Sequence, residues 1–203
     1  MTNLDGSGGL EEQDPHRLVE EALETSLDEA KAGHVGLIQL RLHADGSCSV
    51  QDDGRGIPVG MHVGEGIRAL EVVLCTLHTG TESGFKSYRV APDLYGNGLT
   101  AVNALSEWLE ATVWRDGFEW FLRTERAVPV KPTERRAPTK LRGTKIRFKP
   151  GLSAVGDASD LDFDRLSGRL GELAVLHKGV RFQVSDERSG RSSDFQRKPD
   201  GVL

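Results

Sequence analysis

The chain has 203 residues, of which 37% are hydrophobic and 28% are charged, and its formal net charge is -5. This size suits one domain or two small ones, and the negative charge argues against a surface built throughout for nucleic acid. No apolar run approaches the roughly 20 residues of a membrane span. The two cysteines, Cys48 and Cys75, indicate neither a zinc site nor a disulfide framework. The polar N-terminus has no signal-peptide pattern, so we expect a cytoplasmic protein without a membrane partner.

The first predicted element is an amphipathic helix over 15–32. Asp14 is a suitable N-cap and Pro15 suits the first helical position. Apolar residues then recur at helical spacing up to Gly33, which is a natural stop. The preceding residues, 1–13, are predicted to be a disordered tail, and 14–203 to be the folded domain.

A hairpin is predicted next. Residues 37–42 alternate between apolar and polar, Asp45-Gly46 is a strong turn signal, and a return strand covers 47–52. The stretch "VQDDGRGIP", Val50 to Pro58, therefore lies at the exit of the second strand. It places two adjacent aspartates against a Gly-x-Gly turn.

The rest of the chain alternates helices with strands. Helices are predicted at 65–78, 98–108 and 162–176, and strands at 109–115, 118–125 and 143–149, with two more on either side of "DERSGRSSD". The basic stretch "KPTERRAPTKLR" is predicted to be a solvated loop, with nucleic-acid contact as the alternative. Helices that are separated from an antiparallel run of strands indicate an α+β class, a two-layer sandwich with a mixed, mainly antiparallel sheet covered on one face by helices.

A carboxylate at the end of a buried strand can accept a hydrogen bond from an amino group. Asp52 is therefore a candidate acceptor for the exocyclic amine of adenine, because the glycines after it let the backbone approach a flat ring. The plainer interpretation is an ordinary Asp-Gly turn, since short motifs have a high false-positive risk.

The wider context favours the first interpretation. The motifs "EEALETSLDEAKAGH", "HADGSCSVQDDGRGIPVGMH", "LEVVLCTLHTG", "LYGNGLTAVNALS" and "RGTKIRF" occur in this order. Over roughly 15–200 they resemble the N-terminal ATP-binding subdomain of the bacterial DNA gyrase B subunit and topoisomerase IV. These proteins belong to the gyrase/Hsp90/histidine kinase/MutL ATPase superfamily, which has the Bergerat ATP-binding fold.

The resemblance implies a set of site residues. Glu21 occupies the place of the general base that activates water, although it could equally be a solvated helix residue. The residues that match nucleotide-binding positions are Asp52, Arg55, Gly56, Ile57, Pro58, Tyr88, Gly96, Gly98 and Thr144. Asp52 and Thr144 would hold the adenine end, while Tyr88, Gly96 and Gly98 would lie near the phosphates.

The departures from the family pattern cluster at the phosphate end. The magnesium-binding asparagine falls on Thr25, whose single hydroxyl is a poorer ligand for Mg²⁺. The lid carries Pro92, Asp93 and Glu82 where the family has glycines and a lysine. Where the family has a middle-strand arginine that aminocoumarin drugs use, the resemblance places Phe121 of this chain, so we expect these drugs to bind poorly.

These features predict a domain that binds an adenine nucleotide, ATP, with weak or no hydrolysis on its own. Mg²⁺ is a candidate cofactor that the Thr25 substitution argues against. One alternative is an interaction module that kept the fold and lost the nucleotide, with a topoisomerase or another protein as partner. The other is an ATPase that needs a partner subdomain in trans, because the family's second subdomain would begin where the sequence stops. We expect no DNA cleavage and no direct DNA binding by this chain alone.

Overall fold

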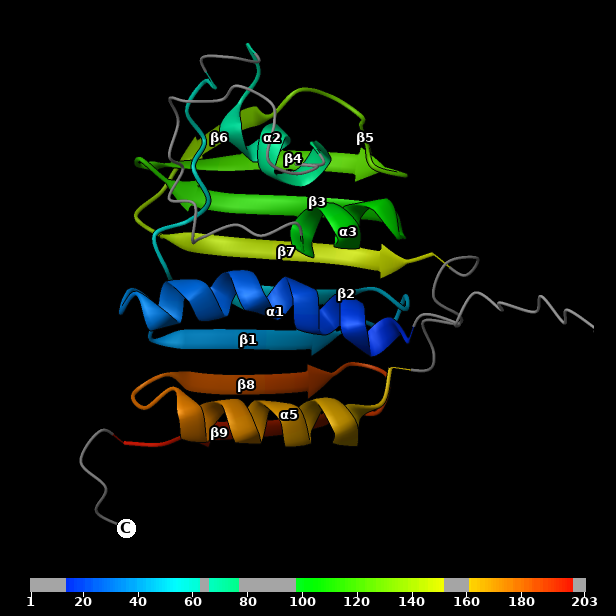
Figure 1. Cartoon of the computed structure of the whole chain (residues 1–203), viewed down its shortest axis with the longest axis vertical. Coiled ribbons are helices and arrows are strands. Elements are labelled where there is room, and N and C mark those ends of the chain that lie inside the picture. Colours follow the sequence, from blue (N-terminus) through cyan, green and yellow to red (C-terminus); the bar gives the residue numbers. More distant parts are fainter. Residues whose placement is uncertain (1–13, 63–65, 77–97, 152–160, 199–203) are drawn as a thin grey trace, which may run out of the picture.

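The computed structural model describes residues 14–62, 66–76, 98–151 and 161–198. Within these residues one sheet of nine strands forms the first layer of the molecule (Figure 1). The strands are β1 (Leu37–Leu42), β2 (Cys48–Asp52), β3 (Ser106–Arg115), β4 (Phe118–Glu125), β5 (Val128–Pro129), β6 (Glu134–Pro138), β7 (Gly143–Pro150), β8 (Arg181–Asp186) and β9 (Arg191–Gln196).

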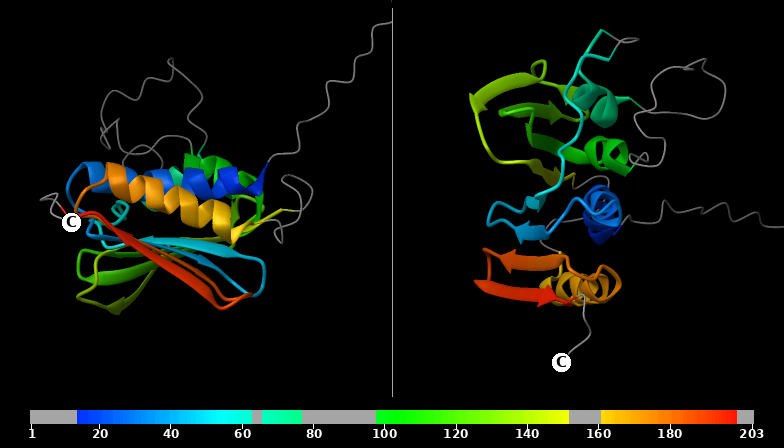
Figure 2. Two further views of the ribbon diagram at one scale, coloured as in Figure 1. Left: turned by 90° about the horizontal axis from the view of Figure 1, so that it is seen from below. Right: turned by 90° about the vertical axis from the view of Figure 1, so that its left-hand side faces the viewer.

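Helices form the second layer, and the views in Figure 2 show them on one face of the sheet. In the described part of the chain they are α1 (Pro15–Lys31), α2 (Ala69–Cys75), α3 (Gly98–Ala104) and α5 (Phe163–Leu176). This arrangement confirms the predicted α+β sandwich with helices on one side of the sheet. The opposite face of the sheet carries no helix among the described residues (Figure 2).

The strand order is β5-β4-β3-β7-β2-β1-β8-β9, with β6 also paired to β4. The β1–β8 pair is parallel, and the other strand pairs are antiparallel. The sheet is therefore mixed and mainly antiparallel, as predicted. β2 lies between β1 and β7 near the centre of the sheet. The side chain at the end of β2 is therefore buried beneath α1.

Helix α1 begins where the sequence predicts. The Asp14 carboxylate accepts a hydrogen bond from the backbone N–H of His16 at 3.0 Å, which caps the helix around Pro15. Its buried side chains form one stripe, made of Leu18, Val19, Ala22, Leu23, Ser26 and Leu27. This stripe packs onto the sheet together with the inward side chains of the central strands, such as Ile38, Val50 and Ile146.

Two of the sequence predictions are wrong, one about where a helix ends and one about a loop. The helix expected over 98–108 ends at Ala104, because the Ser106–Arg115 segment is strand β3, in which Leu109, Ala111 and Val113 alternate as buried residues. The basic stretch expected to be a loop contains strand β6, which pairs with β4. The strand stays exposed throughout, and its arginines Arg135 and Arg136 lie over the rings of Phe118 and Phe121 of β4.

Some expectations fall outside the described residues. These are the disordered tail over 1–13, the lid residues Glu82, Pro92 and Asp93, and the site residues Tyr88 and Gly96. Helix α2 is described over Ala69–Cys75, inside the range predicted for it. None of the helices in the described ranges is both long and apolar enough to cross a bilayer.

Candidate functional site

Asp52 is the last residue of β2, and its side chain is buried beneath α1, with the residue 4% exposed. One carboxylate oxygen, Oδ2, accepts a hydrogen bond from the hydroxyl of Ser26 on α1 at 2.9 Å. The other, Oδ1, accepts from the backbone N–H of Gly54 at 2.9 Å and from that of Thr144 at 3.3 Å. Three donors from three segments thus hold one carboxylate in a fixed orientation.

Burial changes the acidity of this carboxyl group. Desolvation raises the pKa of Asp52 to about 6, and the negative charge of Glu29 adds to the rise. The hydrogen bonds from Gly54, Ser26 and Thr144 act in the opposite direction and limit it. At neutral pH the group is ionised, so it accepts hydrogen bonds and donates none.

The neighbouring aspartate has a different role. Asp53 accepts hydrogen bonds from the backbone N–H groups of Gly36 at 2.8 Å and Leu37 at 3.0 Å. It therefore anchors the start of β1 to the end of β2. The two adjacent aspartates of the "VQDDGRGIP" stretch divide into one that is buried beneath α1 and one that ties the hairpin together.

The glycine loop after Asp52 is held close to β3 and β7. Gly56 has a φ of 78°, and a Cβ atom there would lie 3.0 Å from the Gly143 carbonyl and 3.1 Å from the Trp114 carbonyl. Both the conformation and the contact demand glycine. Ile57, the next residue, donates its N–H to the Thr144 hydroxyl at 3.1 Å, so Thr144 joins the loop to β7 with its hydroxyl and contacts Asp52 with its N–H.

Two arginines hold this loop in place through hydrogen bonds. Arg55 contacts the buried carboxylate of Glu29 on α1 through its backbone N–H at 3.1 Å, its Nε at 3.0 Å and its Nη2 at 2.7 Å. Burial acts to raise the pKa of Glu29, but the hydrogen bonds from Arg55 outweigh it and hold that pKa below its usual value. Arg115, at the end of β3, donates to the Gly56 carbonyl at 2.5 Å.

Arg115 corrects one expectation. The sequence placed the family's middle-strand arginine at Phe121, yet Phe121 pairs with Thr112, which in turn pairs with Lys145 of β7. These residues alternate with the buried ones, so they lie on the face of the sheet away from α1. Phe121 therefore does not border Asp52, and Arg115 is the middle-strand arginine that contacts the glycine loop.

Glu21 lies on the exposed side of α1, next to the beginning of α3. A Cβ atom on Gly98 would come within 2.5 Å of the Glu21 carboxylate oxygen Oε2, so the first residue of α3 leaves room for that carboxylate. Glu21 and Ser26 are five positions apart on α1, which corresponds to about 7.5 Å along a helix axis. Helix α1 thus carries Ser26, which donates a hydrogen bond to Asp52, and, nearer its N-terminus, the carboxylate of Glu21.

Thr25 is half-buried on α1, one turn after Glu21. It supplies one hydroxyl oxygen, and among the described residues there is no group of three His, Cys, Asp or Glu side chains that could hold a metal ion. Mg²⁺ requires about six oxygen ligands in near-octahedral geometry. Because Mg²⁺ usually keeps several waters and takes only one or two protein ligands beside substrate phosphates, Thr25 is the one position on α1 that the resemblance assigns to it.

The remaining sequence expectations divide as follows. The structure brings together Asp52, Arg55, Gly56, Ile57 and Thr144, places Pro58 next in the same loop, and sets Glu21 beside Gly98. Sequence reasoning missed Ser26, Glu29 and Arg115. Ser26 had a usable signal, because it is a polar residue within the apolar stripe of α1. His43, which flanks the Asp45-Gly46 turn, is buried between Ser49 and Glu187.

Comparison with known proteins defines the class. Residues 11–154 match the family described as "Histidine kinase-, DNA gyrase B-, and HSP90-like ATPase", and the chain belongs to that family. Within it, the chain is similar to the B subunit of DNA gyrase. It is 44% identical to the gyrase B protein of Thermotoga maritima over 181 residues, which are 89% of this chain and 28% of the relative.

Other relatives agree. The chain is 44% identical to the gyrase B protein of Haloferax volcanii over 192 residues, or 93% of this chain and 30% of the relative. Its structure resembles the crystal structure of the 43K ATPase domain of Thermus thermophilus gyrase B in complex with an aminocoumarin. The TM-score is 0.78 at 34% identity, covering 91% of this chain and 46% of that one. The chain thus spans less than a third of the two full-length relatives and under half of that domain.

Proposed function

We propose that this chain binds an adenine nucleotide, ATP, with its adenine ring against Asp52. The observation that carries the proposal is the buried, ionised Asp52 carboxylate, held by Ser26, Gly54 and Thr144. A buried carboxylate costs free energy unless it is well paired, and an amino group supplied by a ligand is a further donor of the right kind. Family membership supports the same assignment.

The glycine loop is the second support. Gly54 and Gly56 lie next to the carboxylate without side chains, so the backbone can approach a flat ring. Thr144 and Ile57 fix the loop through their mutual hydrogen bond. Glu21, further along α1, is proposed to face the phosphates and to act as the general base if hydrolysis occurs. Gly98, with Tyr88 and Gly96, is proposed to lie near the same phosphates.

Hydrolysis of ATP transfers its terminal phosphoryl group. The negative charge on that group in the transition state needs a metal ion or cationic side chains for stabilisation. In this chain Thr25 replaces the family's metal-binding asparagine, so we propose that hydrolysis by the chain alone is weak or absent. A role in DNA topology, with a topoisomerase as partner, is proposed from the gyrase relatives and not from any feature of the site.

The decisive experiment is calorimetric titration of the chain with a non-hydrolysable ATP analogue and with adenosine. We expect both to bind, and Asp52→Asn to remove both, because the amide presents a donor or a rotated acceptor to the adenine amine. Losing such a buried hydrogen bond costs about 1–3 kcal/mol, or roughly 5- to 150-fold in affinity. The matched control is Asp53→Asn, whose carboxylate serves the hairpin. Equal affinity in wild type and Asp52→Asn would refute the proposal.

A further inference from the structure

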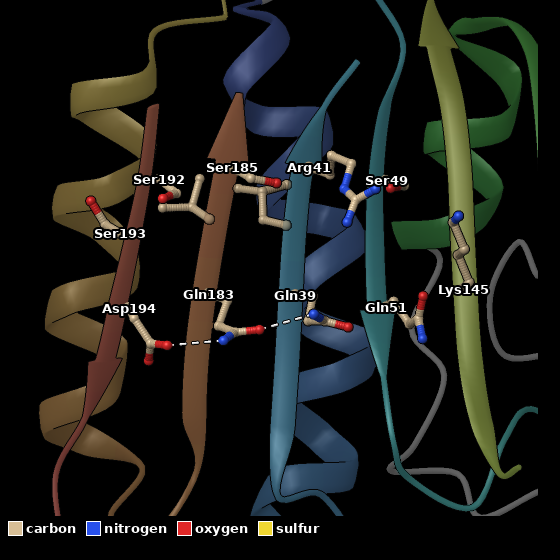
Figure 3. A pocket seen from close by; sticks show the side chains of 12 residues that line it. Gln39, Arg41, Ser49, Gln51, Lys145, Gln183, Ser185, Ser192, Ser193 and Asp194 are labelled. Atoms are coloured by element: carbon tan, nitrogen blue, oxygen red, sulfur yellow. Dashed lines mark hydrogen bonds between the residues drawn. The ribbon is translucent and has the colours of Figure 1, made fainter. Parts of the chain in front are cut away.

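The face of the sheet away from the helices contains a hollow of about 410 Å³ that no part of the nucleotide site uses. It extends across β7, β2, β1, β8 and β9, and Figure 3 shows its side chains rising from these strands on the side opposite α1. Most of its lining residues are polar, with glutamine amides, serine hydroxyls, two cations and one acid, and Leu40 and Val184 complete the lining.

The hollow is ordered in cross-strand rows. In one row Gln39 of β1 lies opposite Gln51 of β2, which lies opposite Lys145 of β7. In the next row Arg41 lies opposite Ser49, and Ser49 lies opposite Arg147. Directly opposed side chains on neighbouring strands are about 4.5–5.5 Å apart at Cβ. The two cations of the lining, Arg41 and Lys145, therefore lie on either side of β2, and Arg147 is two residues along β7 from Lys145.

The acid of the hollow lies at the other end and is already neutralised. Asp194 of β9 accepts from the Arg181 guanidinium at 2.9, 3.0 and 2.5 Å, and from Gln183 Nε2 at 2.9 Å. Gln183 in turn accepts at Oε1 from Gln39 Nε2 at 2.9 Å (Figure 3). This relay fixes the two amides, and it leaves Asp194 without a direct contact to the cations of β1 and β7.

The two arginines near β7 have acidic neighbours, and Arg147 also lies opposite Glu110 of β3. Arg147 contacts Asp45 at 2.8 Å, while Arg41 is 3.7 Å from the half-exposed Glu187. Among the residues that the structure describes, the side chain of Lys145 makes no hydrogen bond and no ion pair, although the residue is half-buried. Burial first, and then the charges of Arg147 and Arg41, lower the pKa of Lys145, while the charges of Glu110 and Glu187 act in the opposite direction.

An antiparallel sheet commonly exposes one polar face to water, and this accounts for the serines and glutamines. It does not by itself account for Lys145, a half-buried cation whose side chain has no hydrogen bond and no ion pair among the described residues. A negative ligand would supply the missing counter-charge, and neighbouring amides and hydroxyls would supply hydrogen-bond donors around it.

We propose that this hollow binds a small oxyanion-bearing molecule, with its phosphate or carboxylate group between Lys145 and Arg41. Gln51 and the hydroxyl of Ser49 contact the same group or the polar atoms next to it. The side chains of Lys145 and Thr144 point to opposite faces of β7, so this site is separate from the proposed nucleotide site and does not depend on it.

The test is thermal unfolding and calorimetric titration of the chain in a chloride buffer of fixed ionic strength. Three probes are compared: inorganic phosphate, glucose 6-phosphate and a tricarboxylate such as citrate. We expect at least one to raise the melting temperature saturably, where NaCl of equal ionic strength does not. The affinity should fall at least tenfold in Lys145→Gln and in Arg41→Gln. The control, Arg169→Gln on α5, should bind as wild type does.

The pattern among the probes identifies the ligand class. Binding of both phosphates indicates a phosphoryl group, and binding of citrate alone indicates carboxylates. Circular dichroism of each variant checks that it is folded, and its melting temperature without anions should equal or exceed that of wild type, because a repulsion is removed. The proposal is overturned if no probe binds, if the response follows ionic strength alone, or if Lys145→Gln and Arg41→Gln bind as wild type does.

Discussion

The hydroxyl of Ser26 donates a hydrogen bond to Oδ2 of Asp52 at 2.9 Å, which joins the middle of α1 to the end of β2. This contact, together with the N–H groups of Gly54 and Thr144, determines where the carboxylate points. It makes the orientation of a proposed adenine acceptor depend on a helix residue 26 positions away.

The first prediction concerns that hydroxyl. Ser26→Ala should keep the fold, because alanine fits an amphipathic helix, but it leaves Oδ2 with one donor fewer. Hydrogen bonds to charged groups contribute about 1.5–3 kcal/mol, so we expect nucleotide affinity to fall by roughly tenfold or more. Titration calorimetry measures the loss, and Ser192→Ala on the exposed strand β9 is the control. An unchanged affinity would show that Ser26 does not orient the acceptor.

The second prediction is the pH dependence of binding. The pKa of Asp52 is raised to about 6 by burial. Only in the ionised form are both carboxylate oxygens acceptors, so only that form can accept from the adenine amino group with either oxygen. Nucleotide affinity should therefore be constant above about pH 7 and fall by about tenfold per pH unit below pH 6. Adenosine is the probe, because it has no phosphate to titrate. A flat affinity between pH 5 and pH 7 would contradict the assignment.

As the pH rises through the pKa of Asp52, the stability of the fold should decrease while the affinity for the nucleotide increases. Since the folded-state pKa of Asp52 lies above the ordinary value of 3.8, the folded chain binds this proton more tightly than the unfolded chain. Its contribution to stability is full below pH 3.8 and is lost as the pH rises through about 6. Ser26→Ala removes a bond that lowers this pKa, so the midpoint of the binding profile should shift to higher pH in that variant.

The fold was largely predictable because its signals are local. The α1 cap at Asp14, the Asp45-Gly46 turn and the alternation of β1 are written in short stretches, and each element lies where these indicate. The misplaced boundary after Ala104 shows the limit: the apolar spacing of "GLTAVNALSEW" suits a helix, while pairing with β4 and β7 makes its last residues strand. Strand β6 was missed because its pairing with β4 gives no hydrophobic alternation in the sequence.

The site was predictable only in part, for a related reason. Asp52 was singled out by its place at the end of a strand before a Gly-x-Gly turn, and Thr144 by the resemblance of motifs; their role at the adenine ring stays a proposal. Arg115 and Glu29 were missed because their roles depend on which strands are neighbours and on which way a side chain faces. Phe121 was misplaced because it belongs to β4 and faces away from α1, whereas the arginine that contacts the glycine loop is at the end of β3.

The third prediction tests the corrected arginine. The Thermus gyrase B relative binds an aminocoumarin, and the resemblance assigns a middle-strand arginine to such drugs. Since Arg115 contacts the glycine loop, we expect an aminocoumarin to bind this chain and Arg115→Gln to weaken it by roughly tenfold, the cost of one charged hydrogen bond. Phe121→Leu, on the opposite face, is the matched control. If Phe121→Leu weakens binding and Arg115→Gln does not, the placement of Arg115 is wrong.

The fourth prediction uses the close approach of α3 to Glu21. Gly98→Ala puts a methyl group within 2.5 Å of the Glu21 carboxylate, so that carboxylate has to rotate away. Adenosine, which we propose to bind only at Asp52, should bind Gly98→Ala as it binds wild type. An ATP analogue, whose phosphates we propose to lie near Glu21 and Gly98, should bind it more weakly. An equal loss for both ligands would mean that the substitution disturbs the whole site.

The last prediction is that the chain alone hydrolyses ATP negligibly. Hydrolysis needs a base that activates water and positive charge that stabilises the phosphoryl oxygens in the transition state. Glu21 can serve as the base, but Thr25 is a poor metal ligand, and the loss of one such electrostatic element typically costs about 100- to 1,000-fold in rate. Phosphate release should therefore stay far below the roughly 1–1,000 per second of typical enzymes. The control is Glu21→Gln, and Thr25→Asn tests the cause, because an amide oxygen at that position should raise the rate. Turnover near 1 per second in wild type, abolished in Glu21→Gln, would establish a working ATPase instead.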